Sequence, residues 1–179
     1  MIVGGHETII EKHPWQVALL FRSKHSCGGS IISETFVLSA AHCFVSSRSL
    51  SDYQLRVGSS YHAKGGEIVK IKRVFIHKKY DTESYDYDFA LIFLAKSLKF
   101  GNKIRPIALI RSNQKIWDGT KSIVTGWGLT KNPFAPNDKL RKASVPIVSQ
   151  ELCKKVYAGG ITDRMICAGH LHGGIDACD

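Results

Sequence analysis

The chain has 179 residues, of which 44% are hydrophobic and 22% are charged, and this balance excludes an intrinsically disordered protein. Its net charge of +10 keeps acidic polymers, such as heparin-like glycans or nucleic acid, among the partners to consider, beside the simpler explanation of a solvated basic surface. No apolar run approaches the roughly 20 residues of a membrane-spanning helix, so we expect no membrane partner.

The first half of the chain predicts a series of short strands. Alternating or apolar runs at regular spacing place these strands at residues 15–21, 30–33, 36–40, 54–58, 67–76 and 89–94. The first run mixes alternation with an apolar end, as a half-buried strand does. The continuous apolar run at 89–94 is typical of a strand that is buried on both faces.

The second half predicts further strands and one helix. A second set of strands begins at residues 122–128, and residues 149–157 favour a helix with Ser149 as its N-cap. Residues 102–107 are the best candidate for a linker between the halves. Short strands separated by Gly and Ser are typical of a β-barrel or a β-sandwich.

Two polar residues stand where a strand ends or begins. His42 follows the small residues Ala40 and Ala41, and Asp88 opens the apolar run at 89–94. A hydroxyl nucleophile needs a His to take its proton and a carboxylate to orient that imidazole, which makes His42 and Asp88 candidates for these roles. Taken singly, a His beside a Cys is more often structural, and an Asp at such a position can simply cap a loop. Asp81 and Asp86 compete with Asp88, but only Asp88 adjoins the apolar run.

The five cysteines indicate disulfides and therefore an oxidising, extracellular location. Two close pairings stand out, Cys27 with Cys43 and Cys153 with Cys167, although the odd number leaves other pairings open. Met1 is followed directly by Ile2-Val3-Gly4-Gly5, without the basic and apolar segments of a secretory leader. Either the protein is cytosolic or its leader lies outside these 179 residues, and the cysteines favour the second.

Eight short motifs together resemble the trypsin-like, chymotrypsin-fold serine endopeptidases. They occur in the order of that family: Ile2-Val3-Gly4-Gly5, Pro14-Trp15-Gln16-Val17, Cys27-Gly28-Gly29-Ser30, Ala40-Ala41-His42-Cys43, Asp88-Phe89-Ala90-Leu91, Gly126-Trp127-Gly128, Met165-Ile166-Cys167-Ala168-Gly169 and Asp176-Ala177-Cys178. The resemblance implies an all-β fold of two antiparallel six-stranded β-barrels. Residues 1–179 would be a partial peptidase domain, with the first barrel at 2–105 and an incomplete second barrel at 106–179.

The resemblance also assigns roles to single residues. His42 and Asp88 match the catalytic base and its carboxylate, and Asp176 matches the residue that binds Arg or Lys at the base of the specificity pocket. Ala177 beside it favours Arg, because a planar guanidinium can bind a carboxylate with two parallel hydrogen bonds. Ile2 matches the N-terminus that activates a zymogen.

The same resemblance puts the nucleophilic serine just beyond Asp179. We therefore expect residues 1–179 to be a fragment that is inactive by itself. The pairs Cys27–Cys43 and Cys153–Cys167 are the bridges that the resemblance implies, and Cys178 would find its partner beyond Asp179 as well.

No cofactor or metal is expected. The spacing of Cys167, His170, His172 and Cys178 fits no strong zinc pattern, and the loop from Ser59 to Glu67, where some relatives bind calcium, has one acidic residue. The expected partners are proteins or peptides cut after Arg or Lys, together with protein inhibitors of proteases. Two alternatives remain: an inactive homologue that acts as a binding or decoy protein, and a basic β-module for acidic glycans.

Overall fold

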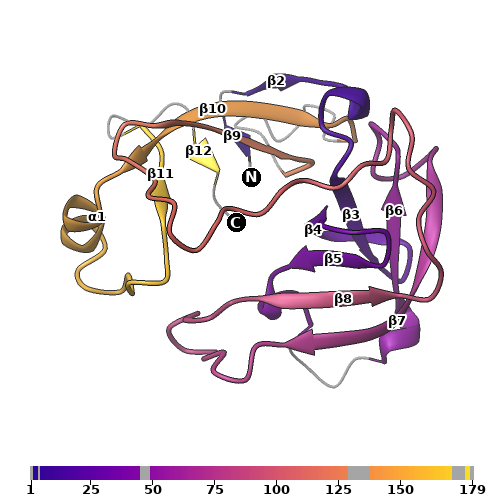
Figure 1. Ribbon diagram of the computed structural model, residues 1–179, viewed down its shortest axis with the longest axis horizontal. Helices are drawn as coiled ribbons and strands as arrows, with labels where there is room; N and C mark the ends of the chain where they lie inside the picture. The colour runs from indigo at the N-terminus through magenta and orange to yellow at the C-terminus, as the bar shows by residue number, and fades with distance from the viewer. Residues whose placement is uncertain (1, 4, 45–48, 129–137, 171–175, 178–179) are drawn as a thin grey trace.

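The computed structural model describes residues 2–3, 5–44, 49–128, 138–170 and 176–177. Figure 1 shows two groups of strands: a barrel, and beside it a smaller sheet with the α-helix at its far end. The mostly β architecture and the closed antiparallel barrel confirm the fold class that the sequence predicts.

Six antiparallel strands close the barrel in the order β3-β4-β5-β8-β7-β6. They are β3 (Gln16–Phe21), β4 (Lys24–Ile31), β5 (Phe36–Ser39), β6 (Tyr53–Val57), β7 (Glu67–Ile76) and β8 (Ala90–Leu94). Short 3-10 helices lie around them: η1 (Ile10–Lys12), η2 (Ala41–Phe44) and η3 (Leu50–Asp52). Each predicted strand of the first half is present, but β4 begins six residues earlier than predicted, in a polar stretch that pairs with β3.

The barrel interior is filled by alternate apolar side chains. In β6 the residues Tyr53, Leu55 and Val57 are buried while those between them are half exposed, which is the period of two that places one face of a strand inward. The same cluster contains Val17, Leu19, Ile31, Val37, Val69, Ile92, Leu94, Leu98 and Ile104. Ile104 lies within the predicted linker at 102–107, so this segment packs against the barrel rather than running free.

The burial of two strands differs from the prediction. The first five residues of β3 are buried, because Val17 and Leu19 face the barrel interior while Ala18 and Leu20 join a second cluster on the other side. Strand β8 instead alternates between buried and half-exposed residues, so the prediction of burial on both faces from its continuous apolar run is wrong. Its half-exposed Phe93 stacks on Phe36 of β5, with ring centroids 5.2 Å apart.

The second group of strands forms an open four-stranded sheet among the described residues. Its strands are β9 (Lys121–Gly126), β10 (Arg141–Val148), β11 (Cys167–Ala168) and β2 (His6–Glu7), and two further short strands, β1 (Ile2–Val3) and β12 (Asp176–Ala177), pair with each other. The central strand, β10, was not predicted. Because β2 pairs with β10, the N-terminal segment contributes a strand to the sheet of the second half.

Helix α1 (Gln150–Val156) was predicted from its N-cap. The Ser149 hydroxyl accepts a hydrogen bond from the Leu152 amide at 3.2 Å, which satisfies one of the free N–H groups at the start of the helix. The helix is short, and none of the helices in the described part of the chain is long and apolar enough to cross a membrane.

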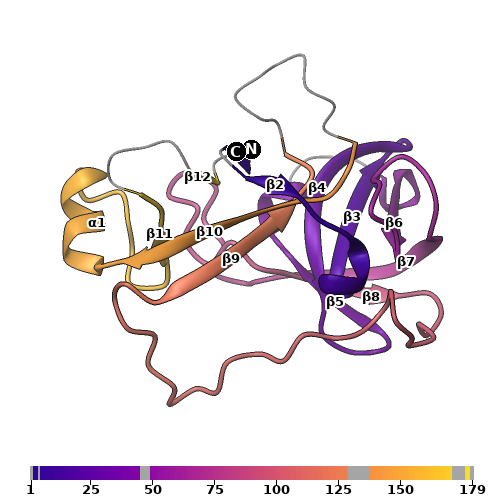
Figure 2. The same ribbon diagram turned by 90° about the horizontal axis from the view of Figure 1, so that it is seen from above.

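A small apolar cluster joins the barrel to the second sheet. It consists of Ile10, Ala18, Leu20, Trp127 and Leu140, all buried. The indole of Trp127 donates to the Ser60 carbonyl at 3.0 Å. Figure 2 shows β9 and β10 side by side, extending between the barrel and α1, so the junction sets how the two groups of strands meet.

Candidate active site

His42 and Asp88 meet because their strands are neighbours in the barrel. Strands β5 and β8 pair antiparallel, and Ser39 at the end of β5 lies opposite Ala90 at the start of β8. His42 follows Ser39 on helix η2, and Asp88 precedes Ala90, so both side chains reach the same end of the barrel. The structure thus brings together the two residues that the sequence selected from positions 46 residues apart.

One carboxylate holds His42 at two points. His42 Nδ1 lies 2.7 Å from Asp88 Oδ2, and the His42 backbone N–H donates to Asp88 Oδ1 at 2.8 Å. A carboxylate only accepts hydrogen bonds, so Nδ1 carries a proton. In neutral imidazole the other nitrogen, Nε2, then keeps its lone pair and can act as a base. The two side chains are 33% and 22% exposed, which leaves the ring accessible.

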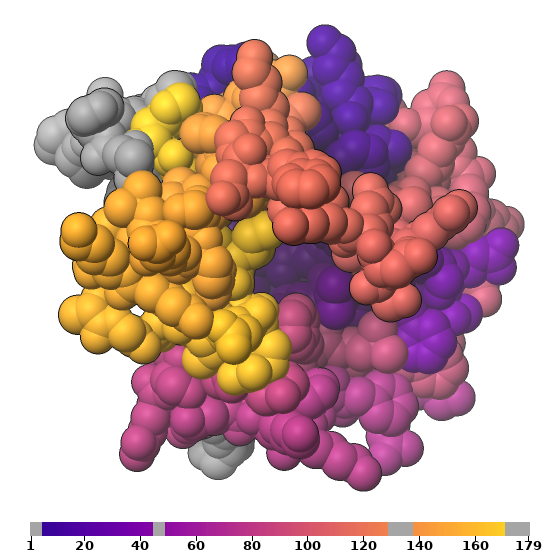
Figure 3. All heavy atoms as spheres, turned by 60° about the vertical axis from the view of Figure 1, so that its left-hand side comes forward, coloured from indigo at the N-terminus to yellow at the C-terminus, as the bar shows by residue number. Residues whose placement is uncertain are grey.

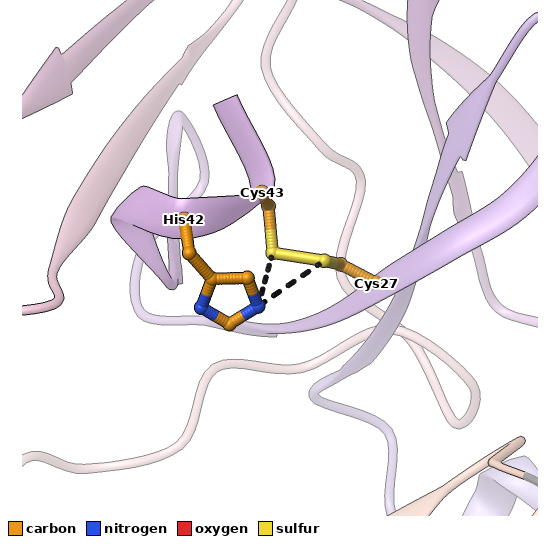
Figure 4. A group of neighbouring side chains, drawn as sticks. All are labelled: Cys27, His42 and Cys43. Atoms are coloured by element: carbon orange, nitrogen blue, oxygen red, sulfur yellow. Dashed lines mark hydrogen bonds between the residues drawn. A yellow bond between two sulfur atoms is a disulfide. The ribbon is translucent and has the colours of Figure 1, made fainter. Parts of the chain in front are cut away.

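A disulfide lies directly beside the imidazole. Cys27 and Cys43 are bonded to each other, and their Sγ atoms lie 4.0 and 3.6 Å from His42 Nε2, as Figure 4 shows. These three residues have the ligand types of a metal site, with all ligand atoms within 4.8 Å of one another. Sulfur atoms in a disulfide are not thiolates, however, so the oxidised group does not fit a metal ion.

The second disulfide joins Cys153 of α1 to Cys167 of β11. The structure therefore contains both pairs that the resemblance implied, with the Cα atoms 6.3 Å apart in each. Cys178, and with it the question of its partner, lies outside the described residues.

The two carboxylates that competed with Asp88 are engaged elsewhere. Asp81 accepts from the Ser84 hydroxyl at 2.6 Å and from the Glu83 amide at 3.0 Å, within its own loop. Asp86 accepts from Arg164 and Thr162 of the second half at distances of 2.6 to 3.0 Å. The hydrogen bonds from Arg164 and then from Thr162 lower the pKa of Asp86 from its ordinary 3.8 to about 2.

The contact between Asp86 and Arg164 was not predicted. It bridges the barrel and the second half on the face that Figure 3 shows, where the gold segment that contains residue 164 meets the magenta segment before β8. The Arg164 guanidinium also lies 4.7 Å from the ring centre of Tyr87, and that ring stacks on His77. Charged residues 78 positions apart give no local pattern, so the sequence alone offered no signal for this pair.

Tyr85 stands beside the imidazole on the same loop. Its ring meets the His42 ring edge to face with centroids 6.1 Å apart, and the residue is 54% exposed. Tyr85 and Tyr87 both adopt left-handed backbone angles, with φ of 56° and 53°. Such angles are costly for residues with a bulky side chain, so the surrounding contacts must hold this loop in place.

Of the remaining predicted site residues, the structure describes the backbone only. Strand β1 pairs with β12 so that Ile2 lies opposite Ala177 and Val3 opposite Asp176. The segment expected to activate the protein and the segment expected to bind substrate are therefore neighbours. The described part of the chain does not include the side chains of Ile2, Asp176 and Ala177. It also does not include any atoms of His172 and Cys178.

The loop from Ser59 to Glu67, considered above as a calcium site, is organised by an arginine. The Arg56 guanidinium donates to the carbonyl oxygens of His62, Ala63 and Gly65 at 2.9, 3.3 and 2.5 Å. Ser59 closes the loop further by donating to the Lys64 carbonyl at 2.6 Å. A cation of the chain thus meets three carbonyl oxygens of the kind that calcium uses as ligands.

Comparison with known proteins identifies the family of the chain. Residues 2–179 match the protein family described as Trypsin. The chain is 46% identical to Trypsin 5G1 of Aedes aegypti over 180 residues, which covers 99% of this chain and 67% of that protein. It is 42% identical to Trypsin of Simulium vittatum, covering 99% and 74%, and 38% identical to the vitellin-degrading protease of Bombyx mori, covering 99% and 67%. The fold is the trypsin fold, and the chain belongs to the trypsin family of serine proteases.

Proposed function

We propose that the protein is a secreted endopeptidase that cleaves peptide bonds after Arg, and less readily after Lys, through an acyl-enzyme. The observation that carries this proposal is the hydrogen bond of 2.7 Å between His42 Nδ1 and Asp88 Oδ2. His42 is the general base in this mechanism, and Asp88 is the carboxylate that orients it. The disulfides Cys27–Cys43 and Cys153–Cys167 suit the oxidising compartment of a secreted protein.

The proposed reaction begins at His42 Nε2. This nitrogen takes the proton of a serine hydroxyl as the oxygen attacks the peptide carbonyl, and later gives the proton to the leaving amine. Asp88 keeps Nδ1 protonated and stabilises the imidazolium that forms. The bond from the His42 backbone to the second carboxylate oxygen fixes Asp88 itself, so base and orienting group keep their geometry through the cycle.

We assign substrate recognition to Asp176 and Ala177. A carboxylate in the pocket pairs with the cation of the substrate, and the methyl side chain of Ala177 offers Lys no hydroxyl, which favours the planar group of Arg. Activation would free the amino group of Ile2, whose strand lies beside that of Asp176. Protein substrates and protein inhibitors that present Arg or Lys are the proposed partners.

The test uses the activated protein together with the segment that supplies the serine. Peptides that differ only in Arg, Lys or Phe before the cleaved bond should give kcat/KM in that order. Asp88→Asn should lower kcat by about 10⁴, the size of effect known for this substitution in serine proteases of this family. Equal rates for Arg and Lys would contradict the Arg preference, and cleavage after Phe would contradict the role of Asp176. If no peptide is cleaved, the result would favour the alternative of an inactive homologue that acts as a decoy.

A further inference from the structure

Three cationic side chains lie together on the outer face of strand β7. They belong to Lys70, Lys72 and Arg73, and all three residues are exposed, whereas Val69 beside them is buried in the barrel. We propose that this face binds a sulfated polysaccharide, with the three side chains as ligands of its sulfate groups. Binding at this face does not depend on the proposed function.

A β-bulge brings neighbouring cations to the same face. In a regular strand successive side chains point to opposite faces, so Lys72 and Arg73 could not both point outward. Strands β7 and β8 pair with Ile71 opposite Leu94, and the next pair is Arg73 opposite Phe93. The register therefore shifts at Lys72, which is the extra residue of a bulge. Because of this shift, both cations are exposed and neither points into the barrel.

The positive charge of this face is not neutralised by the strands around it. Strands β6, β7 and β8 contain one acidic residue, Glu67, and its carboxylate lies 3.6 Å from the Lys96 ammonium. Among the residues that the structure describes, none forms an ion pair with Lys70, Lys72 or Arg73. Like charges this close repel one another, and an anion bound across them relieves the repulsion. The face is therefore complementary in charge to a linear polyanion.

Two phenylalanine rings restrain the cations. Lys72 Nζ lies 5.2 Å from the centre of the Phe93 ring, and the Arg73 guanidinium carbon lies 4.7 Å from the centre of the Phe75 ring. Contacts of this kind restrict the rotamers of long side chains, so less conformational entropy is lost when an anion binds. An ammonium or guanidinium over a ring still has N–H groups that can donate to sulfate oxygens.

Two observations favour a polysaccharide over a nucleic acid. Single-stranded nucleic acids bind by stacking their bases on exposed aromatic rings. On this face the Phe93 ring stacks on Phe36 and is covered by Lys72, and the Phe75 ring is covered by Arg73. In addition, the two disulfides suit an oxidising compartment, where sulfated polysaccharides are the common polyanions.

The face lies away from the catalytic pair. Figure 1 shows β7 and β8 side by side; Asp88 stands just before β8, whereas the bulge lies opposite Phe93, near the other end of that strand. Extended chain from Asp88 to Phe93 spans about 17 Å. A bound polysaccharide should therefore leave His42 accessible. The consequence that a secreted protease would stay active while held on a glycan rests on the proposed function, but the site does not.

The experiment measures binding of the full-length protein to heparin by isothermal titration calorimetry at several salt concentrations. We expect Kd to rise with salt, and heparin stripped of its sulfate groups should not bind. The triple variant Lys70→Gln, Lys72→Gln, Arg73→Gln should bind heparin about tenfold more weakly, or worse, at a salt concentration of about 0.15 M. The slope of log Kd against log salt should become smaller by about one for each cation removed.

Two matched variants show whether position or total charge decides. The variant Lys12→Gln, Lys115→Gln, Lys155→Gln removes three exposed cations elsewhere and should change Kd by less than about threefold, because salt screens distant charges. The variant Lys70→Arg, Lys72→Arg keeps every charge of the face and should bind heparin as the wild type does. Near-ultraviolet circular dichroism should show that each variant is folded, since all of the exchanged side chains are exposed.

If the triple variant of the face is unfolded, the single variant Lys70→Glu replaces it and should weaken heparin binding by about threefold or more. The proposal is overturned by protein that does not bind heparin, or by equal losses of affinity in the two variants that each remove three cations. It is also overturned by wild-type protein that binds single-stranded DNA more tightly than heparin of equal charge, which would assign the face to nucleic acid. None of these readouts requires peptide hydrolysis, so they separate this inference from the proposed function.

Discussion

Arg164 binds both carboxylate oxygens of Asp86 and so ties the second half of the chain to the loop that carries Asp88. Three of its N–H···O contacts measure 2.6, 2.8 and 3.0 Å, and the Thr162 hydroxyl adds a fourth bond at 2.8 Å. Asp86 lies between Tyr85 and Tyr87, which both have left-handed backbone angles. The pair thus holds a strained loop two residues from the candidate catalytic carboxylate.

Removal of this pair should loosen the loop. We expect Arg164→Ala to lower the midpoint of thermal unfolding by about 2–4 °C and to broaden the low-field NMR signal of the proton between His42 and Asp88. Lys154→Ala is the matched control, because Lys154 forms an exposed ion pair of 2.6 Å with Asp163 in the same region. The control should change neither measurement, and equal effects of the two variants would contradict a specific role for Arg164.

The contribution of this pair should vanish in acid. The pKa of Asp86 is about 2 in the folded protein because Arg164 stabilises its carboxylate, while the ordinary value is 3.8. A lowered carboxyl pKa stabilises the folded state fully above the ordinary value, and the effect is lost as pH falls from about 4 to 2. Denaturant unfolding of the wild type and Asp86→Asn should therefore differ most above pH 4 and converge near pH 2.

A buried histidine predicts a second dependence on pH. His13 is 5% exposed, its Nδ1 has no hydrogen-bond partner among the described residues, and burial lowers its pKa below the ordinary 6.5. The unfolded chain then binds more protons, so the free energy of unfolding should fall as pH drops below about 6.5. Burial also lowers the pKa of His62 below 6.5, so His62 should add to the same loss of stability at low pH.

Variants separate the two histidines. His13→Gln should flatten the fall in stability between pH 7 and pH 5 in part, and the double variant with His62→Gln should flatten it further, as measured by urea unfolding. His6→Gln serves as the control because His6 is exposed. A slope that survives the double variant unchanged would show that other groups cause it.

The protection of backbone amides from hydrogen exchange should differ between the two halves of residues 1–179. The barrel closes on itself and contains the larger apolar core, whereas the described strands of the second half form an open sheet. Open edges expose unpaired backbone groups and favour aggregation. Hydrogen exchange of residues 1–179 should show the slowest amides in β3, β6 and β8, and uniform protection in both halves would contradict this expectation.

Residues 1–179 alone should not hydrolyse peptides. The nearest serine before His42 in the sequence is Ser39, and its hydroxyl donates to the Gly28 carbonyl at 2.8 Å instead of to the imidazole. A serine-directed fluorophosphonate probe should leave this polypeptide unlabelled, and an Arg ester should remain intact. Labelling that His42→Ala abolishes would show that another serine serves as nucleophile.

The apolar runs beside His42 and Asp88 made both residues candidates, and the resemblance to the trypsin-like family predicted that they act as a pair. The sequence did not predict β10, because its first residues, Arg141 and Lys142, belong to a basic cluster and Pro146 interrupts the run. That strand exists because β9 and β2 pair with it. Neighbours in space, and not local preference, decide such elements.

The sequence did not predict the long-range polar contacts, for a related reason. The pairing of Asp86 with Arg164, and the three carbonyl oxygens around Arg56, depend on how loops meet after folding. Nothing in the residues beside Arg56 distinguishes it from an ordinary exposed arginine at an alternating strand position. Its role becomes visible only when the loop of residues 59–66 is folded back over it.

Because the Arg56 guanidinium is bonded covalently to the chain, it cannot dissociate from the loop that it organises. A dissolved ion at such a place is lost on dilution or chelation, and the loop would then loosen with the composition of the medium. Arg56 instead is part of strand β6, so its guanidinium is present at the loop in every folded molecule. Changes in calcium concentration should therefore leave the conformation of residues 59–66 unchanged. The loop should be the same in a calcium-rich fluid and in a buffer that contains a chelator.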